Sequence, residues 1–190
     1  MIGLVFAFFI CTAFTTLGRS SVAQIPPLVD FKEVIKLETK IEKVTINPEL
    51  LQSHNNFLHA IGRRESSNRY DITNRFGYMG KYQFGRKTLN SIGFKHIDNK
   101  TFLNSPKLQE EAMLSLLKSN KQILRRQIKR YVGTVVNGVY ITESGLLAGA
   151  HLAGAGNVKK WLRNGKRFKD GLGTSIVSYI ELFGGYKLNI

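Results

Sequence analysis

The residue of this sequence best suited to acid chemistry is Glu65, which follows an amphipathic stretch. Leu50, His54 and Ile61 recur on one face of an expected helix over residues 48–64, and Glu65 comes four residues after Ile61. Helical periodicity therefore places Glu65 on the apolar face or just past its end, where a carboxyl group faces the core or a cleft. Burial raises the pKa of a carboxyl group, and a protonated carboxyl can protonate the leaving oxygen of a glycosidic bond. Glu65 is therefore our candidate general acid.

A second set of suitable groups lies in the glycine- and tyrosine-rich segment 77–84. Gly80 permits a tight turn or a close approach of the backbone to a ligand. Gln83 offers both a donor and an acceptor to a hydroxyl or an amide. Tyr78 and Tyr82 can supply flat surfaces for sugar rings. The alternative is an ordinary loop without a binding role.

Small residues dominate a third segment, which begins at Ala150-His151 and continues through Gly156. Small side chains let two helices approach closely, so this segment is expected to bring neighbouring helices together. Tyr179, in the last expected helix, is a fourth candidate element.

These four elements, in this order, resemble the lytic transglycosylases of the soluble murein-degrading type, which share the lysozyme-like fold. That family's pattern is Glu-Ser, then Gly-x-x-Gly-Leu-Met-Gln, then Ala-Tyr-Asn-Ala-Gly-x-Gly-x-Val-x-x-Trp, then a late Tyr. The resemblance covers roughly residues 48–186. The matching positions are Glu65-Ser66, then Gly77, Gly80 and Gln83, then Ala150, Ala153, Gly154, Gly156, Val158 and Trp161, and finally Tyr179.

The resemblance implies cleavage of the β-1,4 bond between MurNAc and GlcNAc in peptidoglycan, with no metal or organic cofactor. Glu65 would act first as general acid and then as general base. A single acid suffices because the 6-hydroxyl of the substrate closes on the anomeric carbon and forms an anhydro sugar. We expect substrate contacts from Ser66, Gly80, Tyr82, Gln83, Ala150, His151 and Tyr179.

The sequence departs from the family pattern in both central elements. Lys81-Tyr82 stands where the family has Leu-Met, and His151-Leu152 stands where it has Tyr-Asn. A hairpin over residues 131–142 is an addition to the simplest pattern. These changes indicate a divergent member. They also leave open a catalytically inactive cell-wall-binding module on the same fold.

A lysozyme-type hydrolase is the other alternative, and it would need a second carboxylate close to Glu65. Asp71, Asp98 and Asp170 are the candidates, and none of them belongs to a recognisable second-acid motif. Glu143 begins a rival Glu-Ser pair, but a glutamate in the first turn of a helix is explained by the helix dipole alone.

The hydrophobic pattern predicts a mainly α fold with one small β-hairpin, and an irregular loop over residues 66–84. The hairpin is centred on Asn137-Gly138, a dipeptide that suits a type I′ turn. Asn-Pro and Ser-Pro pairs mark two helix starts, since Asn and Ser cap helices and Pro fits the first turn. The expected helices cover residues 48–64, 85–92, 105 to about 130, 143–153, a segment capped by Asn157, and 174–183.

The N-terminal segment differs from the remainder of the chain. Residues 1–17 carry no charge, and Ser21-Val22-Ala23 fits a signal-peptidase site, which predicts a signal peptide over residues 1–23. A retained membrane anchor is the alternative. Residues 24–46 are then a linker or arm, and residues 47–190 the compact domain. The one cysteine, Cys11, lies within the signal segment, so the mature chain would suit an oxidising compartment.

The formal net charge of +15 implies a polyanionic partner. For a protein exported to the periplasm or beyond, anionic wall polymers fit that description better than nucleic acid, and no nucleic-acid-binding motif is present. We expect no stable membrane insertion after removal of the signal peptide. The basic face of the helix after Ser105 would hold the enzyme to the wall.

Overall fold

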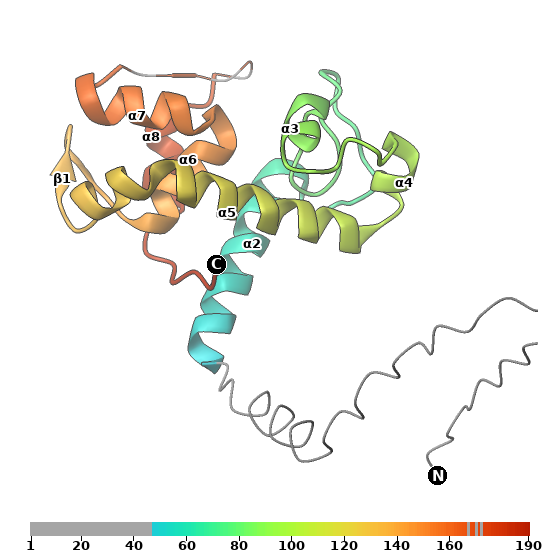
Figure 1. Ribbon diagram of the computed structural model, residues 1–190, viewed down its shortest axis with the longest axis horizontal. Coiled ribbons are helices and arrows are strands. Elements are labelled where there is room, and N and C mark those ends of the chain that lie inside the picture. The colour runs from blue at the N-terminus through green and yellow to red at the C-terminus, as the bar shows by residue number, and fades with distance from the viewer. Residues whose placement is uncertain (1–46, 167, 170, 172) are drawn as a thin grey trace, which may run out of the picture. The chain divides into compact units, whose positions relative to one another are not determined.

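The computed structural model describes residues 47–166, 168–169, 171 and 173–190, all within one compact unit, Ile46–Ile190. These residues form seven helices and one two-stranded antiparallel hairpin, which confirms the mainly α fold (Figure 1). The predicted signal peptide and arm lie outside the described residues and stay predictions. Asp170 also lies outside them.

Helix α2, Pro48–Ser66, carries Glu65 in its last turn. It begins as predicted, because the side chain of Asn47 accepts hydrogen bonds from the backbone N–H groups of Glu49 and Leu50 at 3.0 and 3.1 Å. It ends two residues later than expected, where Ser67 adopts a left-handed conformation with φ 57°. The chain then turns sharply away from the helix axis.

The loop after α2 folds back on itself without forming a regular sheet. Isolated bridges join Thr73 to Met79 and Met79 to Phe84. The chain then enters helix α3, Arg86–Ser91, which agrees with the prediction. Helix α4, Asn99–Leu103, was not predicted. Its five residues are too few for a periodic pattern, and its start depends on one cap, in which the Asp98 carboxylate accepts from the N–H of Thr101 at 2.9 Å.

Helix α5, Pro106–Tyr131, is the longest described element and runs between the α3–α4 side and the α6–α8 side of the unit (Figure 1). Ser105 caps it by accepting from the N–H of Leu108 at 3.3 Å, as its sequence predicts. The opposite end leads into the hairpin of β1, Val135–Val136, and β2, Val139–Tyr140. Asn137 and Gly138 at its turn both have positive φ, of 51° and 83°, as a type I′ turn requires.

Three helices complete the unit: α6, Glu143–Ala153; α7, Ala155–Asn164; and α8, Ile176–Leu182. The predicted cap of α7 was wrong, because the helix begins at Ala155 directly after Gly154. Asn157 instead lies within the first turn, where its side-chain amide donates to the carbonyl of Ala153 at 2.9 Å.

Glycines let α8 pack closely on α6. A Cβ added to Gly145 would lie 2.4 Å from the backbone oxygen of Ile180, and one added to Gly149 would lie 2.9 Å from the Ile180 side chain. This close approach carries Tyr179 of α8 to the side of α6 on which Glu65 lies. The core contains several aromatic side chains, including Phe57, Phe84, Phe102, Trp161 and Phe183.

Among the described residues, no helix is both long and apolar enough to cross a bilayer.

Candidate active site

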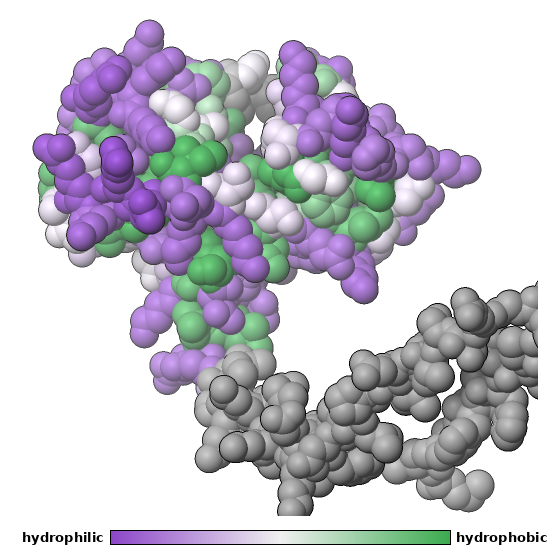
Figure 2. Space-filling model, viewed as in Figure 1, coloured by the Kyte–Doolittle hydropathy of each residue, from purple (hydrophilic) through white to green (hydrophobic). Residues whose placement is uncertain are grey.

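A cleft of about 770 Å³ opens between the α3 side and the C-terminal end of α6. The space-filling view shows the surface notched between these two sides (Figure 2). Glu65 lies in the wall of the cleft, and Leu116, Asn120 and Ile123 of α5 also line it. Gln83, Ala150 and His151 line it too, so the structure brings four of the predicted site residues together.

Two side chains approach the same oxygen, Oε1, of the Glu65 carboxyl group. The hydroxyl of Tyr179 donates to Oε1 at 2.6 Å, and His151 Nε2 lies 3.6 Å from the same oxygen. The Glu65 side chain is 17% exposed. Tyr179, which is 3% exposed, therefore supports Glu65 from behind the cleft surface.

The pKa of Glu65 is not raised, in contrast to our expectation. Burial raises it, but the neighbouring His151 imidazole, the Tyr179 hydroxyl and the charge of Arg64 together outweigh burial and lower the pKa below its usual value. This carboxyl group is therefore ionised near neutral pH. The pKa of Tyr179 is raised by burial and by the Glu65 carboxylate, so its hydroxyl stays protonated and remains a donor.

His151 is enclosed as closely as Glu65. Its side chain is 7% exposed. Its ring meets Phe84 edge to face, with centroids 6.2 Å apart and an interplanar angle of 85°. Its second ring nitrogen, Nδ1, is buried and has no hydrogen-bond partner among the described residues.

Gln83 lines the cleft and has a backbone conformation that is unusual for a residue other than glycine. Its φ is 51°, in the left-handed region. Its side-chain amide donates to the carbonyl of Gly80 at 2.9 Å. The turn that contains Gln83 is closed by two backbone hydrogen bonds between Met79 and Phe84, of 3.0 and 2.8 Å. The carbonyl oxygen of the side chain is left to accept from a ligand.

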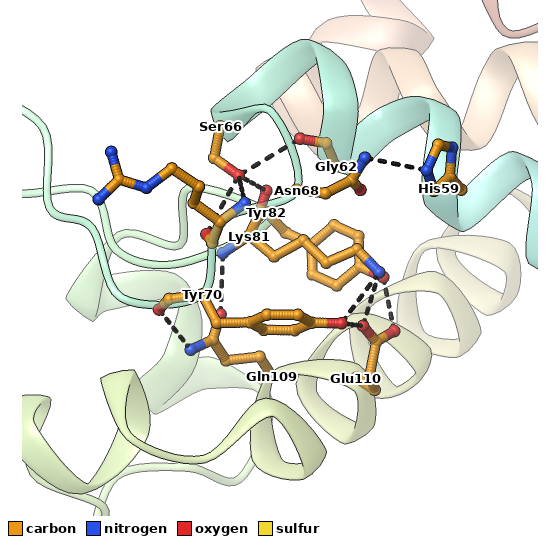
Figure 3. Close-up of polar contacts among 10 residues, drawn as sticks. His59, Gly62, Ser66, Asn68, Tyr70, Lys81, Tyr82, Gln109 and Glu110 are labelled. Carbon is orange, nitrogen blue, oxygen red and sulfur yellow. Dashed lines mark hydrogen bonds and ion pairs between the residues drawn. The ribbon is translucent and has the colours of Figure 1, made fainter.

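Three other predicted contacts, Ser66, Gly80 and Tyr82, lie behind the cleft wall and do not line it. The Ser66 hydroxyl donates to the carbonyl of Lys81 at 2.8 Å (Figure 3). A Cβ on Gly80 would lie 2.0 Å from the side chain of Gln109. Tyr82 is 0% exposed, so its ring cannot stack on a sugar in this structure. These residues instead position the loop that carries Gln83.

The Lys81-Tyr82 departure from the family pattern has a structural explanation in a partly buried polar network with Glu110 (Figure 3). Lys81 Nζ lies 2.7 Å from Glu110 Oε1, and the Tyr70 hydroxyl donates to the same oxygen at 2.6 Å. The Tyr82 hydroxyl donates to Glu110 Oε2 at 2.5 Å. Burial raises the pKa of Glu110, but these partners outweigh burial and lower it. The network attaches the loop to α5.

Sequence reasoning missed several residues that line the cleft, including Phe76, Leu116, Asn120 and Ile123. Phe76 and the predicted Tyr78 are exposed, at 50% and 45%. Exposed aromatic rings in a loop are a signal for sugar binding, and Phe76 could have been chosen on that ground. The α5 residues carry no such signal, because their positions depend on how the helix packs.

Of the possible second carboxylates, the two that the structure describes, Asp71 and Asp98, do not line the cleft. Asp71 is exposed and pairs with Arg69 at 3.2 Å, and Asp98 caps α4. Glu143 pairs with Lys121 at 2.9 Å outside the cleft. Within the described stretches, Glu65 is the one carboxylate that lines the cleft. No three His, Cys, Asp or Glu side chains of that part of the chain are grouped so that they could hold a metal ion.

A mostly helical domain with a glutamate at the end of one helix, facing a cleft, is consistent with the lysozyme-like fold. The family model of the transglycosylase SLT domain matches residues 48–172, so the chain belongs to this family of lytic transglycosylases. Membership supports a lytic-transglycosylase-type function on peptidoglycan. Comparisons with curated proteins and with solved structures gave no match.

Proposed function

We propose that this protein cleaves the MurNAc–GlcNAc β-1,4 bond of peptidoglycan, with Glu65 as its single catalytic carboxylate. The observation that carries the proposal is the position of Glu65, in the wall of the cleft with its Oε1 held by the Tyr179 hydroxyl at 2.6 Å. A positioned acid is what glycosidic cleavage requires.

The proposed reaction uses Glu65 twice. Both polar contacts of its side chain, from Tyr179 and His151, are made at Oε1, so Oε2 is the oxygen that would face the substrate. The protonated carboxyl gives its proton to the glycosidic oxygen as the bond from that oxygen to C1 of MurNAc breaks. The resulting carboxylate accepts the proton of the 6-hydroxyl as O6 bonds to C1. The products are a new 4-hydroxyl on GlcNAc and a 1,6-anhydro-MurNAc end, and the enzyme recovers its proton.

The cleft that contains Glu65 also offers groups that could bind sugars. Phe76 and Tyr78 present exposed rings on which sugars can stack, and Gln83 offers its carbonyl oxygen to a hydroxyl or an acetamido N–H. Ala150 is 3% exposed at the cleft wall and leaves room for the glycan chain.

Anionic wall polymers are proposed to bind the basic face of α5. A second hollow of about 400 Å³ lies along this helix. Its cations include Lys118, Arg125 and Lys129, all exposed, while Lys121 is engaged by Glu143. Export to the periplasm or beyond is part of the same proposal, and sequencing the mature N-terminus tests whether cleavage follows Ala23.

The direct test is the clearing of a suspension of purified peptidoglycan by the mature protein. We expect clearing by the wild-type protein and none by Glu65→Gln, which preserves the shape of the side chain but cannot transfer a proton. Wild-type protein that binds the wall without clearing it would favour the inactive binding module. Equal clearing by both proteins would refute the assignment of Glu65.

A further inference from the structure

Resting on the proposed function, we infer that Asn120 of helix α5 binds an N-acetyl group of the glycan strand. Its side-chain amide pairs with the acetamido group of one sugar, with Nδ2 donating to the acetamido carbonyl and Oδ1 accepting from the acetamido N–H. Asn120 lies outside the four motifs that carry the family resemblance. It is therefore a specificity-determining residue that the resemblance does not assign.

The observation that carries this inference is an amide in the cleft wall that the fold leaves unpaired. Asn120 lines the cleft and is 5% exposed. Its Nδ2 is buried and has no hydrogen-bond partner among the described residues. A buried polar group without a partner destabilises a fold, so such groups are rare in proteins. Rotation about the Cβ–Cγ bond exchanges the two ends of the amide, so a ligand in the cleft can select the orientation that it needs.

The place of Asn120 in α5 is also unfavourable for its residue type. It lies in the middle of a 26-residue helix, where asparagine is a poorer helix former than alanine or leucine. Its neighbours one turn away on the same buried face, Leu117 and Leu124, are apolar and 0% exposed. A residue that breaks the local pattern without a gain within the fold is typical of a functional site.

The surroundings of the amide fit an acetamido group better than a plain hydroxyl group. Leu116 lies one turn before Asn120 and Ile123 one turn after it, and both line the cleft. Ile123 is 48% exposed, so it offers an apolar surface close to the amide. An acetamido group presents a carbonyl, an N–H and a methyl group, which match the two ends of the Asn120 amide and its apolar neighbours. Every residue of α5 that lines the cleft is uncharged, which favours a neutral ligand group.

Calorimetric titration of the full chain with two matched sugars tests the inference without requiring activity. The probes are the β-1,4-linked pentasaccharides of GlcNAc and of glucose, which differ only in having an acetamido or a hydroxyl group at C2. We expect the wild-type protein to bind the GlcNAc pentasaccharide more tightly than the glucose pentasaccharide. Asn120→Ala should bind the GlcNAc pentasaccharide about tenfold more weakly, because the amide hydrogen bonds are lost, and should bind the glucose pentasaccharide as the wild type does.

The matched control is Gln127→Ala, two turns further along α5. The Oε1 of Gln127 is likewise buried without a partner among the described residues, but Gln127 does not line the cleft. This variant should keep both wild-type affinities. The melting temperature of Asn120→Ala should be no lower than that of the wild type, because alanine is the better helix former and Nδ2 has no bond to lose. A lower melting temperature with equal losses for both sugars would show that Asn120 supports the fold, and would overturn the inference.

Turnover of peptidoglycan separates the inference from the proposed function. In an active enzyme, Asn120→Ala should raise KM and leave kcat nearly unchanged, as expected for a contact that is equally strong in the ground state and the transition state. Acetamido-dependent binding without turnover by the wild-type protein would uphold the inference and refute the proposed function. Turnover by a wild-type protein whose affinity for the GlcNAc pentasaccharide is the same as that of Asn120→Ala would overturn the inference and leave the proposed function standing.

Discussion

The Lys81–Glu110 network makes a strong prediction, because Lys81-Tyr82 stands where the family pattern has Leu-Met and both side chains bind the partly buried Glu110 carboxylate. Glu110→Leu would leave the Lys81 ammonium, whose side chain is 11% exposed, without its carboxylate. It would also leave the Tyr82 hydroxyl without its acceptor. Removal of one partner from a buried pair costs about 3–5 kcal/mol. The Glu110 side chain is 35% exposed, so water replaces part of the lost interaction. We therefore expect a loss of about 2–3 kcal/mol in the free energy of unfolding.

The assay is denaturant unfolding at pH 7, followed by the fluorescence of Trp161, the only tryptophan and 1% exposed. The matched control is the triple variant Lys81→Leu/Tyr82→Met/Glu110→Leu, which restores an apolar loop and should recover most of the loss, since apolar replacement of a buried pair is often neutral. A loss under about 1 kcal/mol for Glu110→Leu, or a triple variant as unstable as the single one, would refute the reasoning.

The same comparison has a pH dependence of defined sign. The pKa of Glu110 is lower in the folded protein than its ordinary value. Such a group stabilises the fold above its unfolded pKa of about 4.3, and the contribution disappears as pH falls through the folded value. The difference between wild type and Glu110→Leu should therefore be full at pH 7 and should decrease as pH falls below about 4.3. A difference that stays constant over this range would show that Glu110 acts through packing rather than charge.

Other perturbations test the site, the packing behind it and the basic surface. Tyr179→Phe should lower kcat/KM at least about tenfold, and should raise the pKa of Glu65, because the Tyr179 hydrogen bond lowers it; an unchanged rate would remove Tyr179 from the site. Gly145→Ala should destabilise the α6–α8 contact in thermal unfolding, whereas Gly156→Ala, whose added Cβ meets nothing within 4 Å, should not. Equal effects of the two would contradict the close packing. Wall binding in a pelleting assay should weaken steeply with salt, and should weaken further on charge reversal of three α5 cations, Lys118, Arg125 and Lys129.

Local signals in the sequence predicted most of the helical framework. The caps of α2 and α5 depend on neighbours two or three residues away, and the Asn137-Gly138 turn depends on the two residues themselves. Such features are encoded within a few positions, so they can be recognised without knowledge of the fold. The predicted start of α7 was wrong because Gly154 and Asn157 both fit a helix start, and the helix begins after Gly154, whose φ is 80°.

The chemistry of the site depended on contacts distant in sequence. Tyr179 reaches Glu65 across 114 positions, and only the family resemblance linked them beforehand. The Lys81–Glu110 pair spans 29 positions, and nothing in either segment marks the other as its partner. The pKa of Glu65 was predicted in the wrong direction because periodicity indicated its burial but not its polar neighbours.

The most direct test of the central claim is mass spectrometry of purified peptidoglycan digested by the mature protein, with Glu65→Gln alongside. We predict products that end in 1,6-anhydro-MurNAc from the wild-type protein and none from the variant. Products with a reducing MurNAc end would instead make the protein a hydrolase. Anhydro products formed equally by both proteins would contradict the claim that Glu65 is the acid.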